Sequence, residues 1–196
     1  MGDGSSLAVL GFRPHTYWTA VVALTGRPDA LRVVARRRID FAAGRERFVY
    51  HQARALGPIE GQALIGRVRA AVEANAAREI GRLVADLRGD GAAVRVAVAP
   101  AAAARLPEAL EDILRVHARM HAAEGDFYRD AVAQACAALG LRVHRIAERD
   151  LPPALAEALG VDAAGLEARL HALGAALGPP WNEDYRLAAQ AAWLHL

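Results

Sequence analysis

Three strand-like segments lie within the first 41 residues of the 196-residue chain, and their short connections limit the available folds more than any other feature. The first is an apolar run at residues 7–12, and the second, at residues 17–24, is rich in aromatic and β-branched side chains. The third, at residues 31–41, follows a turn at residues 25–29. Because connections of a few residues join antiparallel neighbours, this part of the chain predicts an antiparallel three-stranded meander.

Beyond residue 41, helix-like and strand-like patterns alternate along the chain. Apolar residues spaced by three and four predict helices, and short apolar or alternating runs predict strands. The predicted helices cover residues 59–89, 106–139, 152–159, 162–173 and 183–195, and the predicted strands cover residues 94–99 and 141–146. We therefore expect an α/β protein with a five-stranded mixed sheet, three antiparallel strands and then two parallel ones, flanked by helices. With 54% hydrophobic residues, the chain is expected to form a single domain over residues 1–196.

Charge and cysteine content argue against several classes of function. The net charge is only +2, which does not favour a dominant polyanion-binding role. Arg36, Arg37 and Arg38 would point alternately to opposite faces of a strand, and this favours protection of a sheet edge over a nucleic-acid-binding stripe. The single cysteine, Cys136, rules out an intrachain disulfide. No apolar run reaches the roughly 20 residues that a membrane helix needs, so we expect a cytoplasmic protein without a membrane partner.

Two short stretches match motifs of a known fold family. Residues 11–15 (GFRPH) and 16–22 (TYWTAVV) look like the G-I-D-P-G and T-G-x-A-V segments of Holliday-junction resolvases. Glu183 and Asp184 open the last predicted helix, where members of that family carry a metal-binding acid. With the order of the predicted elements, these stretches make the chain similar to the ribonuclease-H-like fold, especially its resolvase branch. The resemblance implies that fold for the five-stranded sheet, and nucleic acid as a partner by analogy of fold alone.

The sequence departs from the resolvase pattern where the family's metal-binding acids are expected. Arg13 stands in place of the first Asp, and the predicted strand at residues 94–99 (VRVAVA) has no carboxylate for the second acid. Two-metal cleavage of phosphodiesters needs clustered carboxylates that hold two ions about 4 Å apart, and an Arg there would repel them. We therefore expect degenerate nuclease acids and a role as a binding or assembly module. Whether the protein is an enzyme stays open, as does the formation of a homo-oligomer.

His117, His121 and Glu124 follow one another in steps of four and three on the predicted helix at residues 106–139. They share its apolar stripe, so we expect them to be buried and to form one polar cluster. Two His one turn apart with a third ligand can hold Zn²⁺ or a similar divalent metal. The alternatives are neutral imidazoles hydrogen-bonded inside the core, or a polar pocket without a metal. A metal site would favour a second function, a metal-dependent hydrolase acting on phosphoesters.

His15, His51 and Asp184 are the candidate catalytic residues. In the expected topology the first and third strands run parallel, so His15 and His51 would emerge at the same edge of the sheet, near the first turn of the last helix, which carries Asp184. The alternative is that both histidines are ordinary solvent-exposed loop residues. A nucleotide-binding protein of the related actin-like type is a third hypothesis, which the lack of a Gly-rich phosphate loop disfavours.

Overall fold

The computed structural model describes residues 6–41, 48–102 and 105–196. Five strands form one mixed sheet in the order β3-β2-β1-β4-β5. β1 and β2 are antiparallel, as are β2 and β3, whereas β4 runs parallel to both β1 and β5. The predicted mixed sheet, with three antiparallel strands followed by two parallel ones, is confirmed. The strands are β1 (Ser6–His15), β2 (Trp18–Arg27), β3 (Ala30–Asp40), β4 (Ala92–Pro100) and β5 (Arg142–Ile146).

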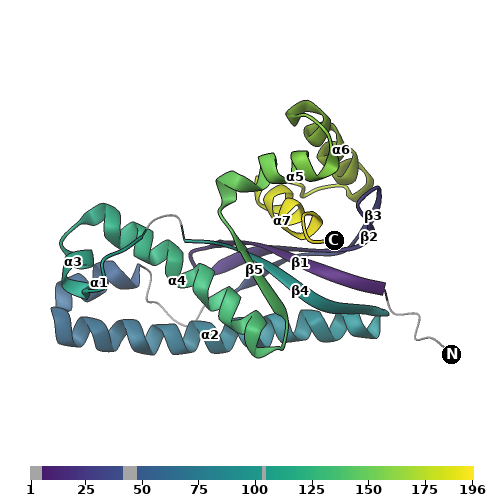
Figure 1. The fold of residues 1–196 in the computed structure, drawn as a ribbon. Coiled ribbons are helices and arrows are strands. Elements are labelled where there is room, and N and C mark those ends of the chain that lie inside the picture. Colours follow the sequence, from purple (N-terminus) through teal and green to yellow (C-terminus); the bar gives the residue numbers. More distant parts are fainter. Residues whose placement is uncertain (1–5, 42–47, 103–104) are drawn as a thin grey trace.

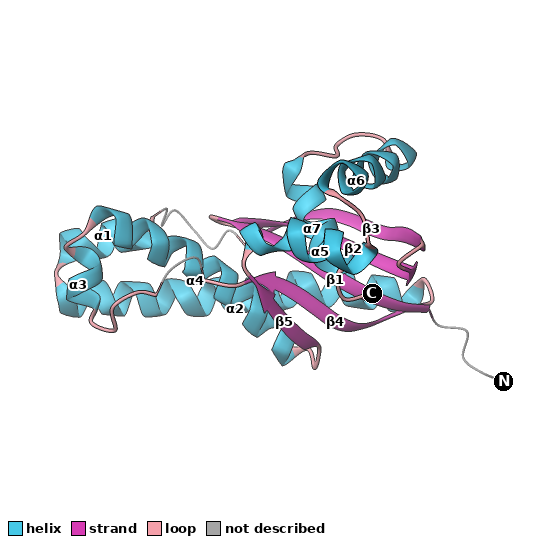
Figure 2. Cartoon of the chain, turned by 45° about the horizontal axis from the view of Figure 1, so that its top comes forward, coloured by secondary structure: helices cyan, strands magenta, loops and turns pink. Residues whose placement is uncertain are grey.

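Helices cover both faces of this sheet (Figure 1). They are α1 (Val49–Leu56), α2 (Pro58–Gly89), α3 (Leu110–Leu114), α4 (His117–Ala138), α5 (Leu151–Leu159), α6 (Ala163–Leu177) and α7 (Glu183–Trp193), with a 3₁₀ turn, η1, at Glu148–Asp150. α2 and α4 lie on one face, and α5, α6 and α7 lie on the other (Figure 1). α2 extends past the sheet, and together with α1, α3 and the beginning of α4 it forms a helical projection (Figures 1 and 2). None of the described helices is long and apolar enough to cross a membrane.

The apolar residues of β1 are divided between two cores. Leu10 and Phe12 pack toward α2 and α4, and Val9 packs toward α7, because successive side chains of a strand point to opposite faces. Gly11 lies under α7, and a Cβ at this position would overlap the carbonyl oxygen of Ala188. The missing side chain therefore lets α7 approach the backbone of the central strand, and this approach places the first turn of α7 near the end of β1.

β1 is longer than the sequence predicts, because it continues through Pro14 to His15. Proline interrupts a sheet when its missing N–H leaves a partner unpaired. β4 pairs with β1 only from Ser6 to Gly11, so the β4 side of Pro14 has no partner strand. β1 therefore does not end before Pro14, and its last residues carry Arg13 and His15 to the carboxyl edge of the sheet.

The basic run on β3 follows the alternation expected of an edge strand. β3 forms one edge of the sheet. Arg37 reaches Asp86 on α2 at 2.8 Å, whereas Arg36 donates a hydrogen bond of 2.6 Å to the carbonyl oxygen of Gly178 on the opposite side. Neighbouring arginines therefore leave the strand in opposite directions and do not form one continuous basic stripe.

Two predicted features of the helices are wrong. The helix predicted at residues 106–139 is interrupted between α3 and α4, where Val116 is extended with φ −120° and ψ 116°. Tyr50 and His51, which lie outside every helix and strand predicted from the sequence, belong to α1, which buries Val49, Tyr50 and Ala53 on one side. The break at Val116 lets the short α3 pack beside α1, and it makes His117 the first residue of α4.

Candidate functional site

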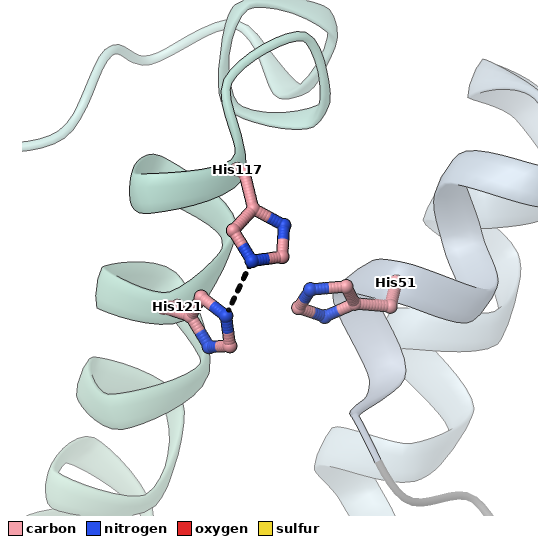
Figure 3. A group of neighbouring side chains, drawn as sticks. All are labelled: His51, His117 and His121. Carbon is pink, nitrogen blue, oxygen red and sulfur yellow. Dashed lines mark hydrogen bonds between the residues drawn. The ribbon is translucent and has the colours of Figure 1, made fainter.

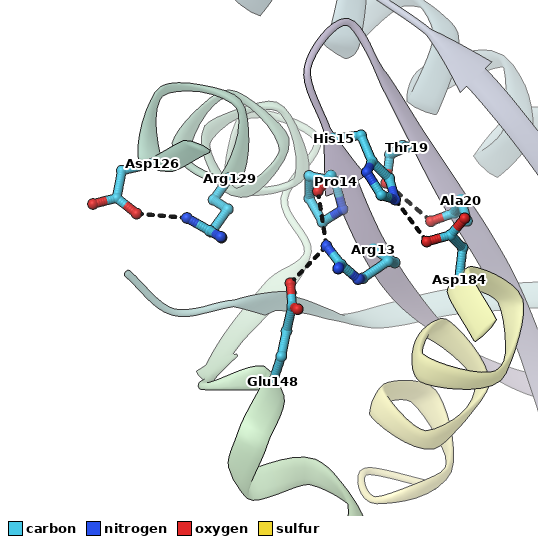
Figure 4. Close-up of polar contacts among 9 residues, drawn as sticks. All are labelled: Arg13, Pro14, His15, Thr19, Ala20, Asp126, Arg129, Glu148 and Asp184. Atoms are coloured by element: carbon cyan, nitrogen blue, oxygen red, sulfur yellow. Dashed lines mark hydrogen bonds and ion pairs between the residues drawn. The ribbon is translucent and has the colours of Figure 1, made fainter. Parts of the chain in front are cut away.

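The carboxyl ends of β1 and β5 and the first turn of α7 meet at one edge of the sheet (Figure 4). Arg13 of β1 forms an ion pair with Glu148 of η1, with 3.0 Å between Nη1 and Oε1, and about a quarter of each side chain is exposed. His15 Nε2 lies 2.6 Å from Oδ1 of Asp184. Parallel strands bring their carboxyl ends to the same edge of an open sheet, which is where α/β proteins bind their ligands. We call this group of residues the edge site.

Local sequence explains how Asp184 reaches His15. Arg13 and His15 are two residues apart on a strand, so both point to the face that α7 covers. The side chain of Asn182 accepts a hydrogen bond from the backbone N–H of Tyr185 at 3.3 Å and caps α7. Asp184 therefore occupies the first turn, where the helix dipole favours a carboxylate.

An aromatic stack fixes the other side of His15. The imidazole lies on the indole of Trp18, with 4.2 Å between ring centroids and an interplanar angle of 10°. The guanidinium of Arg38 lies 4.0 Å from the ring centroid of the same Trp18, within the range of a cation–π interaction. His15 is thus held between a carboxylate and an indole, and one of its nitrogens is already used by Asp184.

A cavity of about 260 Å³ lies next to the Arg13–Glu148 ion pair. Its lining residues are Ala101, Arg129, Ala147, Glu148 and Arg149. Arg129 pairs with Asp126 on its own helix at 2.8 Å. Nε of Arg13 is buried without a hydrogen-bond partner within the described part of the chain, whereas Nη1 of the same side chain forms the ion pair with Glu148. The edge site therefore has one guanidinium donor, Nε of Arg13, left for a ligand.

The structure separates the two histidines expected to emerge together. His51 lies on α1 in the helical projection, and its ring contacts His117 and His121 of α4, with 5.2 and 4.9 Å between ring centroids. The Nε2 atoms of His117 and His121 are 2.9 Å apart (Figure 3). Burial and the neighbouring His121 and His117 lower the pKa of His51 below its usual value. We call these three residues the histidine cluster.

Glu124 is not part of the histidine cluster. It is only 3% exposed, and its two carboxylate oxygens accept hydrogen bonds from the backbone N–H groups of Val49 and Tyr50, at 3.0 and 3.1 Å. Burial raises the pKa of Glu124, and the two backbone hydrogen bonds oppose that shift. Glu124 therefore caps the first turn of α1 and fixes α1 against α4.

The expectation that His117, His121 and Glu124 are all buried is wrong for the two histidines, which are exposed. The two histidines lie in the first two turns of α4, in the projection, where they face His51 of α1 and remain exposed, whereas Met120 is buried (Figure 3). Sequence reasoning also missed Glu148 and Arg129 at the edge site. The position of Glu148, just after the strand that ends at Ile146, is the signal that could have identified it.

Comparison with known proteins supports the fold. Two solved structures match over 96% of this chain and 92% of their own: T. thermophilus RuvC in complex with Holliday junction substrate, with a TM-score of 0.53 and 13% identity, and a Thermus thermophilus RuvC structure, with 0.51 and 12%. The fold is ribonuclease-H-like, of the RuvC type. No family model matches the chain, and a search of curated proteins found no match either. At 12–13% identity the likeness shows the fold alone.

Proposed function

We propose that this protein is a binding module on a RuvC-type fold and does not cleave by two-metal nuclease chemistry. One observation carries the proposal: the carboxylates of the edge site are already paired with basic side chains, Glu148 with Arg13 and Asp184 with His15. A divalent ion at Glu148 would lie within a few ångströms of the Arg13 guanidinium and would be repelled by it. Two-metal cleavage needs free, clustered carboxylates, so binding is the role that the edge site supports best.

The partner we propose is the phosphate backbone of a nucleic acid. The matched RuvC structure holds a Holliday junction substrate, and we extend that partner class to this chain by analogy of fold. Arg129 and Arg149 line the cavity beside Arg13, and guanidinium groups bind phosphate oxygens in a bidentate manner. With a net charge of +2, the contact would be local, and only a few phosphates would be neutralised.

The metal-dependent hydrolase hypothesis, based on His117, His121 and Glu124, receives less support. Both oxygens of Glu124 are engaged by backbone N–H groups, so the carboxylate that would complete the ligand set is held elsewhere. The histidine cluster lies between α1 and α4 in the projection, whereas the edge site lies at the end of β1 (Figures 3 and 4).

Fluorescence anisotropy with a labelled four-way junction, a duplex and a single strand would test the binding proposal. At about 50 mM salt we expect saturable binding that weakens as salt rises. Replacing Arg129 and Arg149 together by Gln should reduce the salt slope by about two, whereas Arg67→Gln, an exposed arginine of α2, should change little. Absence of binding to all three nucleic acids, or a double variant that binds like the wild type, would refute the proposal.

A cleavage assay with the same substrates tests the other half of the proposal. We expect no cleavage in Mg²⁺ or Mn²⁺, because Arg13 and His15 already engage the acids of the edge site. The matched control is Asp184→Ala, which removes an acid from the position where the resolvase resemblance implies a metal ligand. Metal-dependent cleavage by the wild type that disappears in Asp184→Ala would show that the chain is a nuclease.

A further inference from the structure

Three imidazoles from two different helices converge in the projection. Their rings point toward one another, with His51 on α1 facing His117 and His121 on α4 (Figure 3). One nitrogen from each ring lies within 4.8 Å of the nitrogens of the other two. Nδ1 of His51 is buried without a hydrogen-bond partner in the described residues, and Nε2 of His117 lies 2.9 Å from Nε2 of His121. Three mutually facing imidazoles with an unpartnered buried nitrogen are an arrangement that a shared cation would stabilise.

The spacing of these nitrogens fits a tetrahedral metal centre. Zn–N bonds of about 2.0–2.1 Å place two nitrogens on a tetrahedral ion roughly 3.4 Å apart. The nitrogens here are separated by 2.9 Å for one pair and by at most 4.8 Å for the others, so small side-chain rotations are enough to reach that geometry. Neutral imidazole suits Zn²⁺ and its first-row neighbours, whereas Mg²⁺ and Ca²⁺ prefer oxygen ligands.

We propose that His51, His117 and His121 form a binding site for one Zn²⁺-like divalent transition-metal ion. His117 and His121 supply two ligands one helical turn apart on α4, and His51 supplies the third across the interface. Because His117 and His121 are exposed, the fourth coordination position opens to solvent. The site is distinct from the edge site and from the proposed binding of nucleic acid.

The fold holds the third ligand in place before any metal binds. α1 is only eight residues long, and its first turn is tied to α4 through the buried carboxylate of Glu124. His51 directly follows Tyr50, so the same contact that caps α1 sets the distance between His51 and the histidines of α4. A preorganised ligand set loses less conformational entropy when the ion binds.

Isothermal titration of ZnCl₂ into the untagged, EDTA-treated and dialysed chain tests the proposal. We expect one equivalent to bind, and single substitutions His51→Ala, His117→Ala and His121→Ala should each weaken binding at least tenfold. His171→Ala removes an exposed histidine of α6 and serves as the matched control; it should bind like the wild type. CoCl₂ should give the visible absorption of a tetrahedral complex with the wild type and His171→Ala only.

Thermal unfolding supplies a second readout that does not depend on the titration. A hundredfold excess of ZnCl₂ over its dissociation constant should raise the Tm of the wild type by about 5–10 °C, and EDTA should reverse the shift. Circular dichroism verifies the fold of each variant, and His117 and His121 are exposed, so their truncation should leave it intact. Absence of saturable binding at one equivalent, or wild-type affinity in the His117→Ala and His121→Ala variants, would overturn the proposal. Loss of binding only in His144→Ala would also overturn it, because the ion would then belong to the stacked His144–His195 pair.

Discussion

Removing the carboxylate of Glu124 should lower the free energy of unfolding far more than the truncation of an exposed glutamate does. Glu124 is 3% exposed and is the acceptor for two backbone N–H groups, those of Val49 and Tyr50. In Glu124→Ala both donors lose their partner, and a buried donor without a partner costs about 1–3 kcal/mol. We therefore expect a loss of about 2–5 kcal/mol in the free energy of unfolding. For a chain of this length, the middle of that range corresponds to a fall in Tm of roughly 7–14 °C.

The graded variant Glu124→Gln separates hydrogen bonding from packing. Its amide keeps the volume of the side chain but offers one oxygen as an acceptor, so about half of the loss is expected. The matched control is Glu157→Ala, which truncates an exposed glutamate of α5 and should change stability by less than about 0.5 kcal/mol.

Urea denaturation followed by circular dichroism measures the global loss, and hydrogen exchange locates it. An isolated helix shorter than about 12 residues is marginal in water, so α1 depends on its contacts with α2 and α4. In Glu124→Ala the amides of Val49 and Tyr50 should exchange faster than those of α2. If Glu124→Ala stays within about 0.5 kcal/mol of the wild type and exchange at Val49 and Tyr50 is unchanged, the carboxylate does not hold α1 and our reasoning is refuted.

Two further predictions follow from the same packing. Gly11→Ala should destabilise the protein by about 2–4 kcal/mol in urea denaturation, because the added Cβ would overlap the Ala188 carbonyl of α7. Gly66→Ala is the control, and it should be neutral or stabilising because the space around Gly66 is open. Equal stability of the two variants would contradict this account of the packing of α7. The pKa of Glu124 is raised by burial, so the folded state holds the Glu124 proton more tightly than the unfolded state does. The stability that comes from this bound proton is therefore complete below the pKa of Glu124 in the unfolded state, and it is lost as pH rises through the pKa in the folded state. As pH rises above about 4, the usual pKa of a glutamate, the wild type should therefore lose stability relative to Glu124→Gln, and a difference independent of pH would contradict the shift.

The sheet could be predicted because its signals are local. The alternation of β3, the apolar runs of β1 and β2 and the turn between β2 and β3 fix an antiparallel meander, and β4 and β5 each follow a helix long enough for a parallel crossover. The end of β1 could not be placed, because Pro14 breaks a strand only if a neighbour needs its N–H. That condition depends on where β4 stops pairing, which is a property of the tertiary structure.

The histidine cluster could be predicted only in part. The spacing of His117 and His121 places them one turn apart on any helix, and this holds in α4. The third member depends on how α1 packs against α4, and no local pattern links His51 to residues so far along the chain. The break at Val116 was equally hidden, because Ile113 and Met120 on either side are both buried, so the apolar pattern runs through the interruption without a gap.

Helix α4 contributes residues to both proposed sites, His117 and His121 to the histidine cluster and Arg129 to the cavity of the edge site. His121 and Arg129 are eight residues apart, about 12 Å along the helix axis, which exceeds the Debye length of about 8 Å at physiological salt. A divalent ion at the histidine cluster would therefore change the potential at the cavity only slightly. Phe127, Tyr128 and Val132 anchor the middle of α4 in the core, so a rigid shift of the helix would have to disturb the packing against β1. Coupling between two sites needs an element with two arrangements that both ligands bias. Because α4 is packed in this way, it has only one arrangement, so binding of a metal ion at the histidine cluster is expected to leave the affinity of the edge site for its ligand unchanged.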